Sequence, residues 1–381
     1  MANISIIGTG FVADLYMRSL QTFPEIKILK VFDEDNIRLK AFSDFWKVPA
    51  AGSIEEIVVT DGKNEVPDLI LNLTNPSSHF KVSKQCLEAN RNVYSEKPLA
   101  TKMEDAFTLH EIAKTKNLIL ASAPCSYLSE VAQTIWLGVR EQMIGQPLLV
   151  YAELDDDFIT QAPYRKWLSE SGAPWPYRDE FMVGCTLEHA GYYLTWLMMI
   201  FGSVKKVVAA SAELVKNKLP DLEKSAPDYA TATLFFESGM VARITCSIIG
   251  PQNHSLRVIG DEGILEVNES WNNNAKVKVR KRHVIRRKLI NSPFAKTIKI
   301  KGKTHPKVPR RGAAAMNFAL GPAEILGDIL AGSQVHHYAD FALHLNEVTL
   351  AMQNSLDTEG VQLMKTKCPN LLPKSWAKAL S

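Results

Sequence analysis

The chain has 381 residues, of which 46% are hydrophobic and 22% charged, with a formal net charge of +3. This composition is that of a soluble globular chain, and the length allows two or three domains. No apolar run is long enough to cross a bilayer, and the first strand follows at once without a signal peptide, so we expect a cytoplasmic protein with no membrane partner. The five cysteines are scattered and form no C-x-x-C pair, which predicts neither a disulfide framework nor a metal site.

A strand, a glycine turn and a helix are predicted at the start of the chain. Asn3–Ile7 is a short β-branched run, the sequence GTGFVA follows at residues 8–13, and a helical pattern continues to Leu20. In a dinucleotide-binding turn, the first glycine allows the tight turn, the second lets a pyrophosphate approach, and a small third residue lets helix and strand pack closely. The helix N-terminus attracts the phosphates. The residues predicted to contact the cofactor here are Gly8, Gly10, Phe11 and Val12.

A second predicted strand, Ile26–Phe32, ends at Asp33, about 20 residues after the turn, where a ribose-binding acid belongs. A carboxylate there accepts hydrogen bonds from the ribose hydroxyls of NAD and repels the 2′-phosphate of NADP, and no Arg or Lys follows directly. We therefore favour NAD over NADP as the cofactor. The alternative role for Asp33 is that of a helix N-cap.

Polar residues follow the next predicted strand, Asp68–Leu73, whose apolar character suits a parallel sheet covered on both faces. Thr74, Asn75 and Pro76 come directly after it and His79 a little later, at the carboxyl end where open α/β sheets bind ligands. Ser77 or Ser78 can cap the following helix, which is expected to reach Ala89. For His79 the alternative is a polar surface position.

A lysine is predicted at the end of the strand Asn92–Ser95, in the sequence Glu96-Lys97-Pro98. A proline that stiffens the turn can aim this cation into the crevice, although a solvated surface charge is the alternative. Residues 101–104 (TKME) predict a capping box for a helix through Lys114. Leu118–Ala123 is predicted as a sixth strand, which closes a two-halved nucleotide-binding fold near residue 125.

The motifs at residues 8–13, at Thr74-Asn75-Pro76 with His79, and at Glu96-Lys97-Pro98 together resemble the glucose–fructose oxidoreductase / inositol dehydrogenase (Gfo/Idh/MocA) family. The resemblance implies an α/β protein with an N-terminal Rossmann domain, residues 1–125, and a C-terminal α/β domain, residues 126–381. In the family, the second domain has an open, mostly antiparallel sheet that often mediates oligomerisation, so we expect a homo-oligomer, a dimer or tetramer. The last helices are expected to pack back near the Rossmann domain. The resemblance also places Thr74, Asn75, Pro76, His79, Glu96 and Lys97 at the cofactor.

The region after residue 125 begins with a predicted helix, Ser129–Met143, and a strand, Leu148–Leu154, that ends in the acidic triplet at residues 155–157. The triplet lacks histidines at metal-ligand spacing, so a solvated loop is the preferred interpretation. Residues 163–181 predict a loop rich in aromatic and basic side chains, which stack on sugar rings or hold phosphate and carboxylate groups. The predicted substrate contacts are Arg165, Trp167, Trp175 and Arg178. The alternative is a lid that merely buries its own aromatic residues.

The helix from Gly184 to Phe201 resembles the family's Asp-x-Gly-x-His helix with substitutions. Glu188 stands at the Asp position, and Tyr192 stands at the position of the histidine that usually transfers the proton. Residues four apart share a helix face, and His189 is close enough to reach the same cleft. Either Tyr192, with its pKa lowered by Lys97, or His189 could therefore move the proton. The alternatives are a helix that only lines the domain interface, and a loss of catalysis.

Alternating strands joined by hairpin turns predict an antiparallel meander in the second half, at Val204–Val215, Tyr229–Glu237, Met240–Ile249, His254–Gly260 and Gly263–Val267. Residues 276–311 are strongly basic and contain no Asp or Glu. We interpret them first as a solvated edge hairpin, then as a site for a polyanionic substrate, and least as a nucleic-acid site. Two helices, at Gly312–Leu330 and Tyr338–Leu356, follow, with His336 and His337 expected at the surface.

The sequence thus predicts an NAD(P)-dependent oxidoreductase that transfers a hydride between the nicotinamide and a sugar, sugar derivative or nucleotide sugar. Lys97 would polarise the reacting oxygen, Tyr192 or His189 would move the proton, and Glu188 would orient one of them. Two alternatives come from relatives in the same family. One is glycoside hydrolysis with a tightly held NAD, and the other is a non-catalytic, dinucleotide-sensing regulator.

Overall fold

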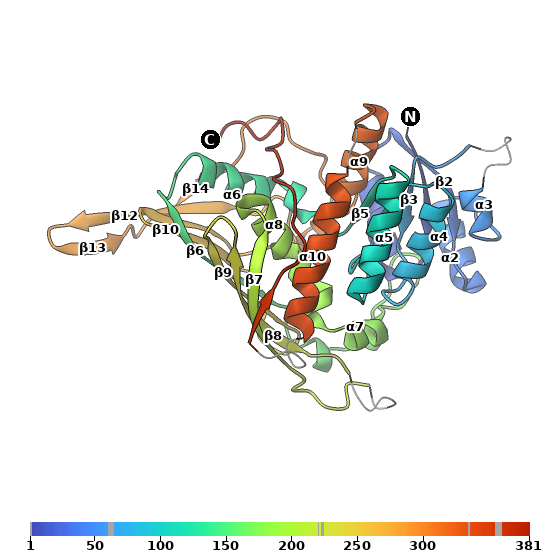
Figure 1. Ribbon diagram of the computed structural model, residues 1–381, viewed down its shortest axis with the longest axis horizontal. Coiled ribbons are helices and arrows are strands. Elements are labelled where there is room, and N and C mark those ends of the chain that lie inside the picture. Colours follow the sequence, from blue (N-terminus) through green and yellow to red (C-terminus); the bar gives the residue numbers. More distant parts are fainter. Residues whose placement is uncertain (1, 60–64, 220, 222–224, 334–335, 355–359) are drawn as a thin grey trace.

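The structure is a computed structural model that describes residues 2–59, 65–219, 221, 225–333, 336–354 and 360–381 (Figure 1). The first part of the chain forms a five-stranded parallel sheet with strand order β2-β1-β3-β4-β5. Its elements are β1 (Ala2–Ile7), α1 (Phe11–Leu20), β2 (Ile26–Phe32), α2 (Asn36–Trp46), α3 (Glu55–Val58), β3 (Leu69–Asn72), α4 (His79–Glu88), β4 (Val93–Ser95), α5 (Met103–Thr115) and β5 (Leu120–Ser122).

The central strand β3 is buried along its whole length because helices cover both faces of this sheet. Helices α1 and α2 contribute to the core on one face, and α3, α4 and α5 contribute to the core on the other. This is the Rossmann arrangement that the sequence predicts. Within the described residues, however, the sheet has five strands and not six.

The second part of the chain forms a ten-stranded sheet that is largely antiparallel. Its helical elements are η1 (Ser126–Leu128), α6 (Glu130–Arg140), η2 (Ile159–Gln161), η3 (Tyr164–Lys166), α7 (Tyr177–Val183), η4 (Thr186–Ala190), α8 (Gly191–Phe201), η5 (Gly312–Ala315), α9 (Leu320–Leu330) and α10 (His337–Gln353). Its strands are β6 (Pro147–Asp155), β7 (Val204–Ala212), β8 (Tyr229–Phe236), β9 (Val241–Ser247), β10 (Leu256–Gly260), β11 (Gly263–Val267), β12 (Val277–Ile285), β13 (Lys288–Asn291), β14 (Lys296–Ile298) and β15 (Val361–Leu363).

The predicted meander is interrupted by β6, the strand of this sheet that comes first in the sequence. The strand order is β13-β12-β11-β10-β6-β9-β8-β7-β15, so β6 lies between β9 and β10 and pairs in parallel with β9. The prediction joined β9 to β10 because they are neighbours in the sequence, but β6 forms backbone ladders with both of them. The helices α6, α8 and α10 pack on one face of the sheet, and among the described elements no helix covers the other face (Figure 1).

Helix α10 connects the two parts of the molecule (Figure 1). One side of it packs against α5 through Ala339, Ala342 and Leu343. The predicted apolar stripe from Phe341 to Met352 packs against the core of the large sheet. Helix α9 packs on the opposite face of the Rossmann sheet from α5. The expectation that the closing helices return to the Rossmann part therefore agrees with the packing, while the predicted end of the last helix at Leu356 lies outside the described residues.

Two predicted helix caps are wrong. Ser78 occupies the N-cap of α4, but its side chain makes no capping hydrogen bond. Lys102, not Thr101, occupies the N-cap of α5, again without a capping side chain. The carboxylate that caps α2 is Asp35, which accepts from two first-turn amides, so Asp33 is free of that role.

All five cysteines are free and buried. The residues that the structure describes contain no cluster of His, Cys, Asp and Glu that could hold a metal ion. None of the described helices has the length and apolar character that a bilayer crossing needs.

Candidate active site

Two cavities adjoin each other at the glycine turn. The first, which we call the turn cavity, has a volume of about 530 Å³ and is lined by Gly8, Gly10, Asp33, Arg38, Thr74 and Asn75, among others. The second, the large cavity, has a volume of about 1030 Å³ and begins at Phe11 and Val12. Because Gly10 and Phe11 are consecutive, a single elongated ligand can pass over the turn from one cavity to the other.

The turn has the backbone geometry that the sequence predicts. Gly8 has a φ of +98°, and a Cβ there would lie 2.5 Å from the backbone of Leu73, so only glycine fits. A Cβ on Gly10 would meet no atom within 4 Å, so the space above this residue is open. Gly10 is also the N-cap of α1 and provides no capping side chain. The Ala13 amide donates to the Gly10 carbonyl, which leaves the amides of Phe11 and Val12 for an anion, and the residues present fit a bound diphosphate.

Asp33 is more heavily engaged than predicted. Its Oδ2 accepts hydrogen bonds from the amide and hydroxyl of Thr9 and from Arg38 Nε, and its Oδ1 accepts from the Asp35 amide and from Arg38 at 2.7 Å. Burial opposes its charge, but these hydrogen bonds lower the pKa of Asp33 overall. No Arg or Lys follows Asp33 directly, but α2 brings the guanidinium of Arg38 back onto the carboxylate.

Hydrogen bonds to Asn72 and to the loop after β4 hold the segment from Thr74 to His79 in place. Asn72 Oδ1 accepts from the Thr74 hydroxyl at 2.7 Å, which fixes the threonine at the edge of the turn cavity. His79 is fully buried, and its two ring nitrogens lie 2.6 Å from the Pro98 carbonyl and 2.8 Å from the Thr74 carbonyl. The surface interpretation of His79 is wrong. This ring joins the loops after β3 and β4, and neither it nor Pro76 lines either cavity.

Lys97 lies in the large cavity and forms an ion pair with Glu188. The preceding residue, Glu96, is also buried there and accepts hydrogen bonds from Tyr16 Oη at 2.6 Å and from the Lys97 amide at 3.1 Å. Burial opposes the charge on Lys97, but Glu188 and the other nearby acids outweigh it and raise the pKa of Lys97. The lysine is therefore a partly buried, permanent cation and not a solvated surface charge.

The segment Thr186–Ala190 is a π-helix that runs directly into α8. A π-helical turn of this kind is frequent at functional sites because it redirects the side chains it carries. Here it brings Glu188 and His189, together with Tyr192 of α8, into the wall of the large cavity. The three side chains that the sequence predicts to share one cleft therefore do share it, beside Lys97.

The predicted electrostatics of Tyr192 are wrong. Lys97 does favour the phenolate, but burial is the larger effect and raises the pKa of Tyr192. Burial likewise lowers the pKa of His189, which leaves a neutral imidazole with a free lone pair at neutral pH. Of the two candidates for proton transfer, His189 is thus the one in a state that can accept a proton.

Two acidic residues line the large cavity although neither was predicted as a site residue. Glu180 was not singled out, and Asp156 was assigned to a solvated loop. Glu180 of α7 is nine-tenths buried, its Oε1 has no hydrogen-bond partner among the described residues, and it lies 3.5 Å from His189 Nε2. Burial, assisted by Glu188, raises the pKa of Glu180 well above its usual value. Asp156 of the acidic triplet lies 3.5 Å from the same nitrogen, so the interpretation as a solvated loop fails for this residue. No local pattern marks either carboxylate, since their neighbours come from distant elements.

The four predicted substrate residues divide into two pairs. Trp167 and Trp175 line the large cavity and pack edge to face at 5.2 Å between ring centroids. Arg165 instead stacks on Tyr177 and donates to its hydroxyl, and Arg178 pairs with Asp221 at the surface. Neither arginine lines the cavity. The idea of a lid that buries its own aromatics therefore holds in part, because Tyr164, Tyr177 and Phe181 pack on one another.

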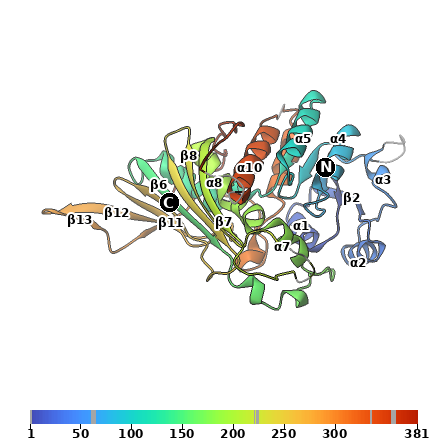
Figure 2. The ribbon, with the colours of Figure 1, turned by 60° about the horizontal axis from the view of Figure 1, so that its bottom comes forward.

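The hairpin at the centre of the basic segment lies far from the site. Strands β12 and β13 form a hairpin that projects at the opposite end of the molecule from the Rossmann part (Figures 1 and 2). None of the Lys and Arg residues between positions 276 and 311 lines the large cavity. This placement agrees with the edge-hairpin interpretation and gives no support to a polyanion held in the cavity by these side chains.

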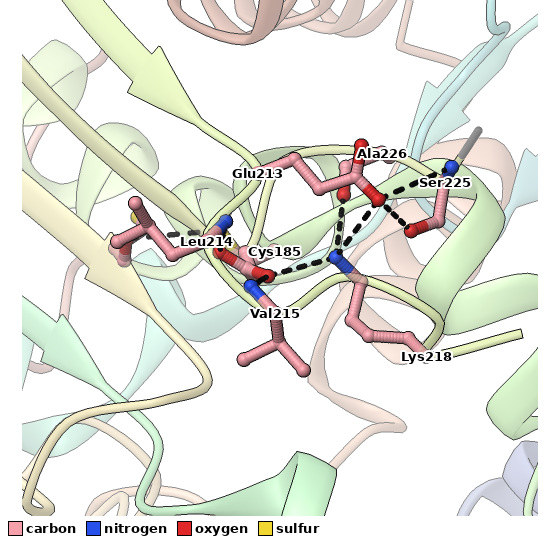
Figure 3. A network of polar contacts seen from close by, with 9 residues as sticks. Cys185, Glu213, Leu214, Val215, Lys218, Ser225 and Ala226 are labelled. Atoms are coloured by element: carbon pink, nitrogen blue, oxygen red, sulfur yellow. Dashed lines mark hydrogen bonds and ion pairs between the residues drawn. The ribbon is translucent and has the colours of Figure 1, made fainter.

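A network of polar contacts holds the loop between β7 and β8 together (Figure 3). Lys218 Nζ lies 2.8 Å from Asp228 Oδ2 and 3.6 Å from Glu213, and both partners of the first pair are almost fully buried. Asp228 also accepts the amides of Leu214 and Val215. The Ala226 amide donates to the Phe181 carbonyl, and the Cys185 amide donates to the Pro227 carbonyl. The loop between β7 and β8 is thereby tied to the residues that flank Glu180 and the π-helix.

The fold and the site together define an oxidoreductase that uses a nicotinamide dinucleotide. Two sequence profiles, described as "Oxidoreductase family, NAD-binding Rossmann fold" and "GFO/IDH/MocA C-terminal domain", match residues 2–123 and 134–266. The chain belongs to the Gfo/Idh/MocA oxidoreductase family.

Similar proteins are dehydrogenases with low sequence identity to this chain. Mouse trans-1,2-dihydrobenzene-1,2-diol dehydrogenase is 22% identical over 269 residues, which are 70% of this chain and 74% of that protein. The scyllo-inositol 2-dehydrogenase (NADP+) of Bacillus subtilis is 21% identical over 207 residues, or 54% of this chain and 53% of the relative. The solved structure of levoglucosan dehydrogenase in complex with NADH has a TM-score of 0.73 at 15% identity, and covers 97% of this chain and 100% of that chain. That likeness establishes the shared fold.

Proposed function

We propose that this chain interconverts a secondary alcohol and a ketone on a neutral ring polyol, such as a sugar, a sugar derivative or a cyclitol. One observation carries the proposal. The large cavity is lined both by Phe11 and Val12 of the glycine turn and by Lys97, Glu188 and His189, so a ligand that crosses the turn would enter a cavity that holds a cation and a proton acceptor.

The dinucleotide would lie with its diphosphate over Gly10 and the first turn of α1, and with its adenosine ribose near Asp33 and Arg38 in the turn cavity. Thr74 and Asn75 would contact it from the opposite wall, and His79 would act indirectly by holding Thr74. When bound, the nicotinamide supplies the hydride chemistry that no side chain can provide.

The side chains of the large cavity would prepare the alcohol for reaction. Lys97 would donate a hydrogen bond to the reacting oxygen and stabilise the negative charge that develops on it. His189 would accept the hydroxyl proton during oxidation and return it during reduction. Glu188 would hold the Lys97 ammonium group in place through their ion pair.

The lining of the cavity favours a neutral substrate with a ring. Trp167, Trp175 and Trp271 offer aromatic faces for an apolar ring surface. Both cations of the lining are already paired, Lys97 with Glu188 and Arg18 with Glu170, while further carboxylates remain. A nucleotide-linked sugar would place its phosphates against these acids. The names of the mouse and Bacillus relatives also describe ring diols or polyols.

The test combines binding and turnover. We expect calorimetry to show binding of NAD(H) or NADP(H) and a panel of myo-inositol, scyllo-inositol, D-glucose and UDP-glucose to show reduction of the coenzyme with at least one neutral member. Coenzyme binding without any turnover across a broad polyol panel would contradict the proposal and support a sensing role. Release of p-nitrophenol from a p-nitrophenyl glycoside without net NADH formation would support glycoside hydrolysis.

The open face of the large sheet supports a further part of the proposal, that the protein is a homo-oligomer. At the edge of the sheet, Val208, Val361 and Leu363 are each at least 40% exposed. On the central strands, Tyr151, Ile259 and Ile264 are half-buried and point away from the helices. A second copy packed on this face would remove the apolar surface from water. Light scattering after size exclusion should give a mass of two or four chains, and a monomer would contradict this part.

A further inference from the structure

A line of buried charged groups ends beside His189. Asp156, which directly follows β6, lies with Oδ2 3.5 Å from His189 Nε2 and with Oδ1 3.4 Å from His254 Nε2. The other ring nitrogen of His254 lies 3.5 Å from Glu269 Oε1. The order of the groups is thus His189, Asp156, His254, Glu269, from the cavity wall towards the partly exposed Glu269.

These groups have few other partners. The His254 side chain is 1% exposed, and neither of its ring nitrogens has a conventional hydrogen bond in the described part of the chain. Trp271 covers the line, with its ring centroid 4.5 Å from that of His254 and 6.2 Å from that of His189. Its backbone amide donates to Glu269 at 2.8 Å. Catalytic hydrogen bonds are often long before substrate binds, so contacts of about 3.5 Å can shorten in the complex.

Neighbouring groups along this line carry opposite charges that stabilise one another. Burial opposes a charge on His254, but Asp156 and Glu269 outweigh it and raise the pKa of His254 to about 9, so its ring is cationic at neutral pH. This cation balances the charge of Asp156, which the fold has removed from bulk water. Asp156 therefore lies between the His254 cation and the His189 ring.

His189 faces several other charged groups, and their effects differ. Lys97, beyond β4, and His254 both lower the pKa of His189, while Glu188 of the π-helix raises it. Asp156 is the strongest of the groups that favour the protonated ring. Glu180 of α7 lies at the same distance from Nε2, but burial, assisted by Glu188, raises the pKa of Glu180 and so disfavours its charged form.

We propose that Asp156, held in place by His254 and Glu269, is a positioning residue that orients the His189 ring and stabilises the imidazolium that forms when His189 takes a proton from the substrate. This role rests on the proposed function. During oxidation the carbinol C–H bond breaks and its electron pair leaves as hydride to the oxidised coenzyme. The O–H bond breaks as its proton passes to His189, and the C=O double bond forms from the electrons left on oxygen. The site then contains one new positive charge on His189, opposite Asp156.

The first test needs no turnover. We would follow the imidazole titrations of the full chain by NMR with NADH added. Asp156→Asn should lower the pKa of His189 by about one unit or more, because a facing anion is lost. Glu269→Gln, at a partly exposed position, should lower the pKa of His254. It replaces Asp156→Asn as the test variant if Asp156→Asn folds poorly. An unchanged His189 titration in Asp156→Asn, or an unchanged His254 titration in Glu269→Gln, would overturn the proposal.

The second test uses the pH dependence of kcat with the neutral polyol that supports the fastest reduction of the coenzyme. Asp156→Asn should lower kcat by about 10- to 100-fold with little change in KM, and should move the acidic limb of the profile to lower pH. A matched control is His110→Gln, which removes a buried histidine paired with Asp340 at 2.7 Å between α5 and α10, away from the cavity. The control should keep the wild-type profile.

The two tests separate the inference from the proposed function. Turnover together with an unshifted profile in Asp156→Asn would overturn the positioning role and leave the proposed function standing. Absence of turnover with every polyol would overturn the proposed function and the positioning role with it, even if Asp156→Asn shifts the NMR titration of His189.

Discussion

Lys97 and Glu188 form an ion pair across the large cavity although 91 residues separate them in the sequence. The lysine comes from the loop after β4 of the Rossmann sheet, and the glutamate comes from the π-helix that precedes α8. The pair therefore joins the Rossmann part of the molecule to the wall of the large cavity, and it holds the Lys97 ammonium group at that wall.

Replacing Lys97 should separate catalysis from binding. We expect Lys97→Ala to lower kcat by about 10²- to 10³-fold, because a charge-stabilising donor is lost, while coenzyme affinity changes by less than about two-fold. Steady-state kinetics and calorimetry measure the two effects. Lys102→Ala, at an exposed position just before α5, is the control and should leave both values unchanged. An unaltered rate in Lys97→Ala would remove Lys97 from the mechanism.

The two candidates for proton transfer should respond differently to replacement. His189→Gln should lower kcat by about 10²- to 10⁴-fold, the range expected for loss of a general base. Tyr192→Phe should lower it by about ten-fold at most, since burial keeps the phenol protonated and only a hydrogen bond is lost. Parallel rate measurements at one pH decide between them, and a larger loss in Tyr192→Phe would reverse the assignment.

Arg38 should determine how well NADP is accepted. The guanidinium neutralises Asp33 and lies in the turn cavity, so it can also face a 2′-phosphate. We expect Arg38→Ala to weaken NADP(H) binding by about ten-fold or more and to leave NAD(H) binding unchanged or tighter. Lys40→Ala on the same helix, which loses only an exposed pair with Asp44, is the control. Equal losses for both coenzymes would contradict this role.

The buried Lys218–Asp228 pair should matter for stability. Asp228→Ala deprives the buried Lys218 ammonium group of its nearest carboxylate and two amides of their acceptor, so we expect a loss of about 3–5 kcal/mol in the free energy of unfolding. Urea denaturation measures it. Arg178→Ala removes a solvent-exposed pair with Asp221 and should barely move the midpoint. Similar midpoints for the two variants would show that the buried pair contributes little.

The raised pKa of His254 predicts a pH-dependent contribution to stability. Its pKa is about 9 in the folded chain and about 6.5 when unfolded, so the contribution is complete below pH 6.5 and is lost as the pH rises through 9. The difference in unfolding free energy between wild type and His254→Gln should therefore shrink by roughly 2–3 kcal/mol between pH 6 and pH 10.

A second buried histidine provides the control for this measurement. Burial lowers the pKa of His344 to about 4, so this ring is neutral throughout the same interval. The stability difference for His344→Gln should stay constant from pH 6 to pH 10. A difference for His254→Gln that also stayed constant would show that His254 carries no extra charge in the folded chain.

Much of the Rossmann part is predictable because its signals are local. Gly8 is required by a contact with Leu73, but its place in a strand–turn–helix pattern is visible in thirteen consecutive residues. The same locality explains the errors. The expected capping box failed because Lys102 and not Thr101 is the N-cap of α5, and the meander failed because β6 enters between two strands that follow each other in the chain.

The sequence predicted which residues lie in the site better than it predicted their protonation states. Lys97, Glu188, His189 and Tyr192 were expected in one cleft, and they line one cavity. Their protonation was not predictable, since it depends on burial and on carboxylates from α7 and from the end of β6. Glu180 in particular sits in a segment where the basic and aromatic residues are more conspicuous, and only its buried, unpartnered oxygen marks it.

By itself the sequence determined the glycine turn, the order of strands and helices in the Rossmann part, and the family, because steric limits and apolar periodicity act between residues that are close along the chain. Only the tertiary structure decided that Arg38 returns to Asp33, that Glu180 and Asp156 flank His189, and that the basic hairpin stays remote from the cavity. Charge, solvation and distance between separate elements control those features, and such quantities have values only after the chain has folded.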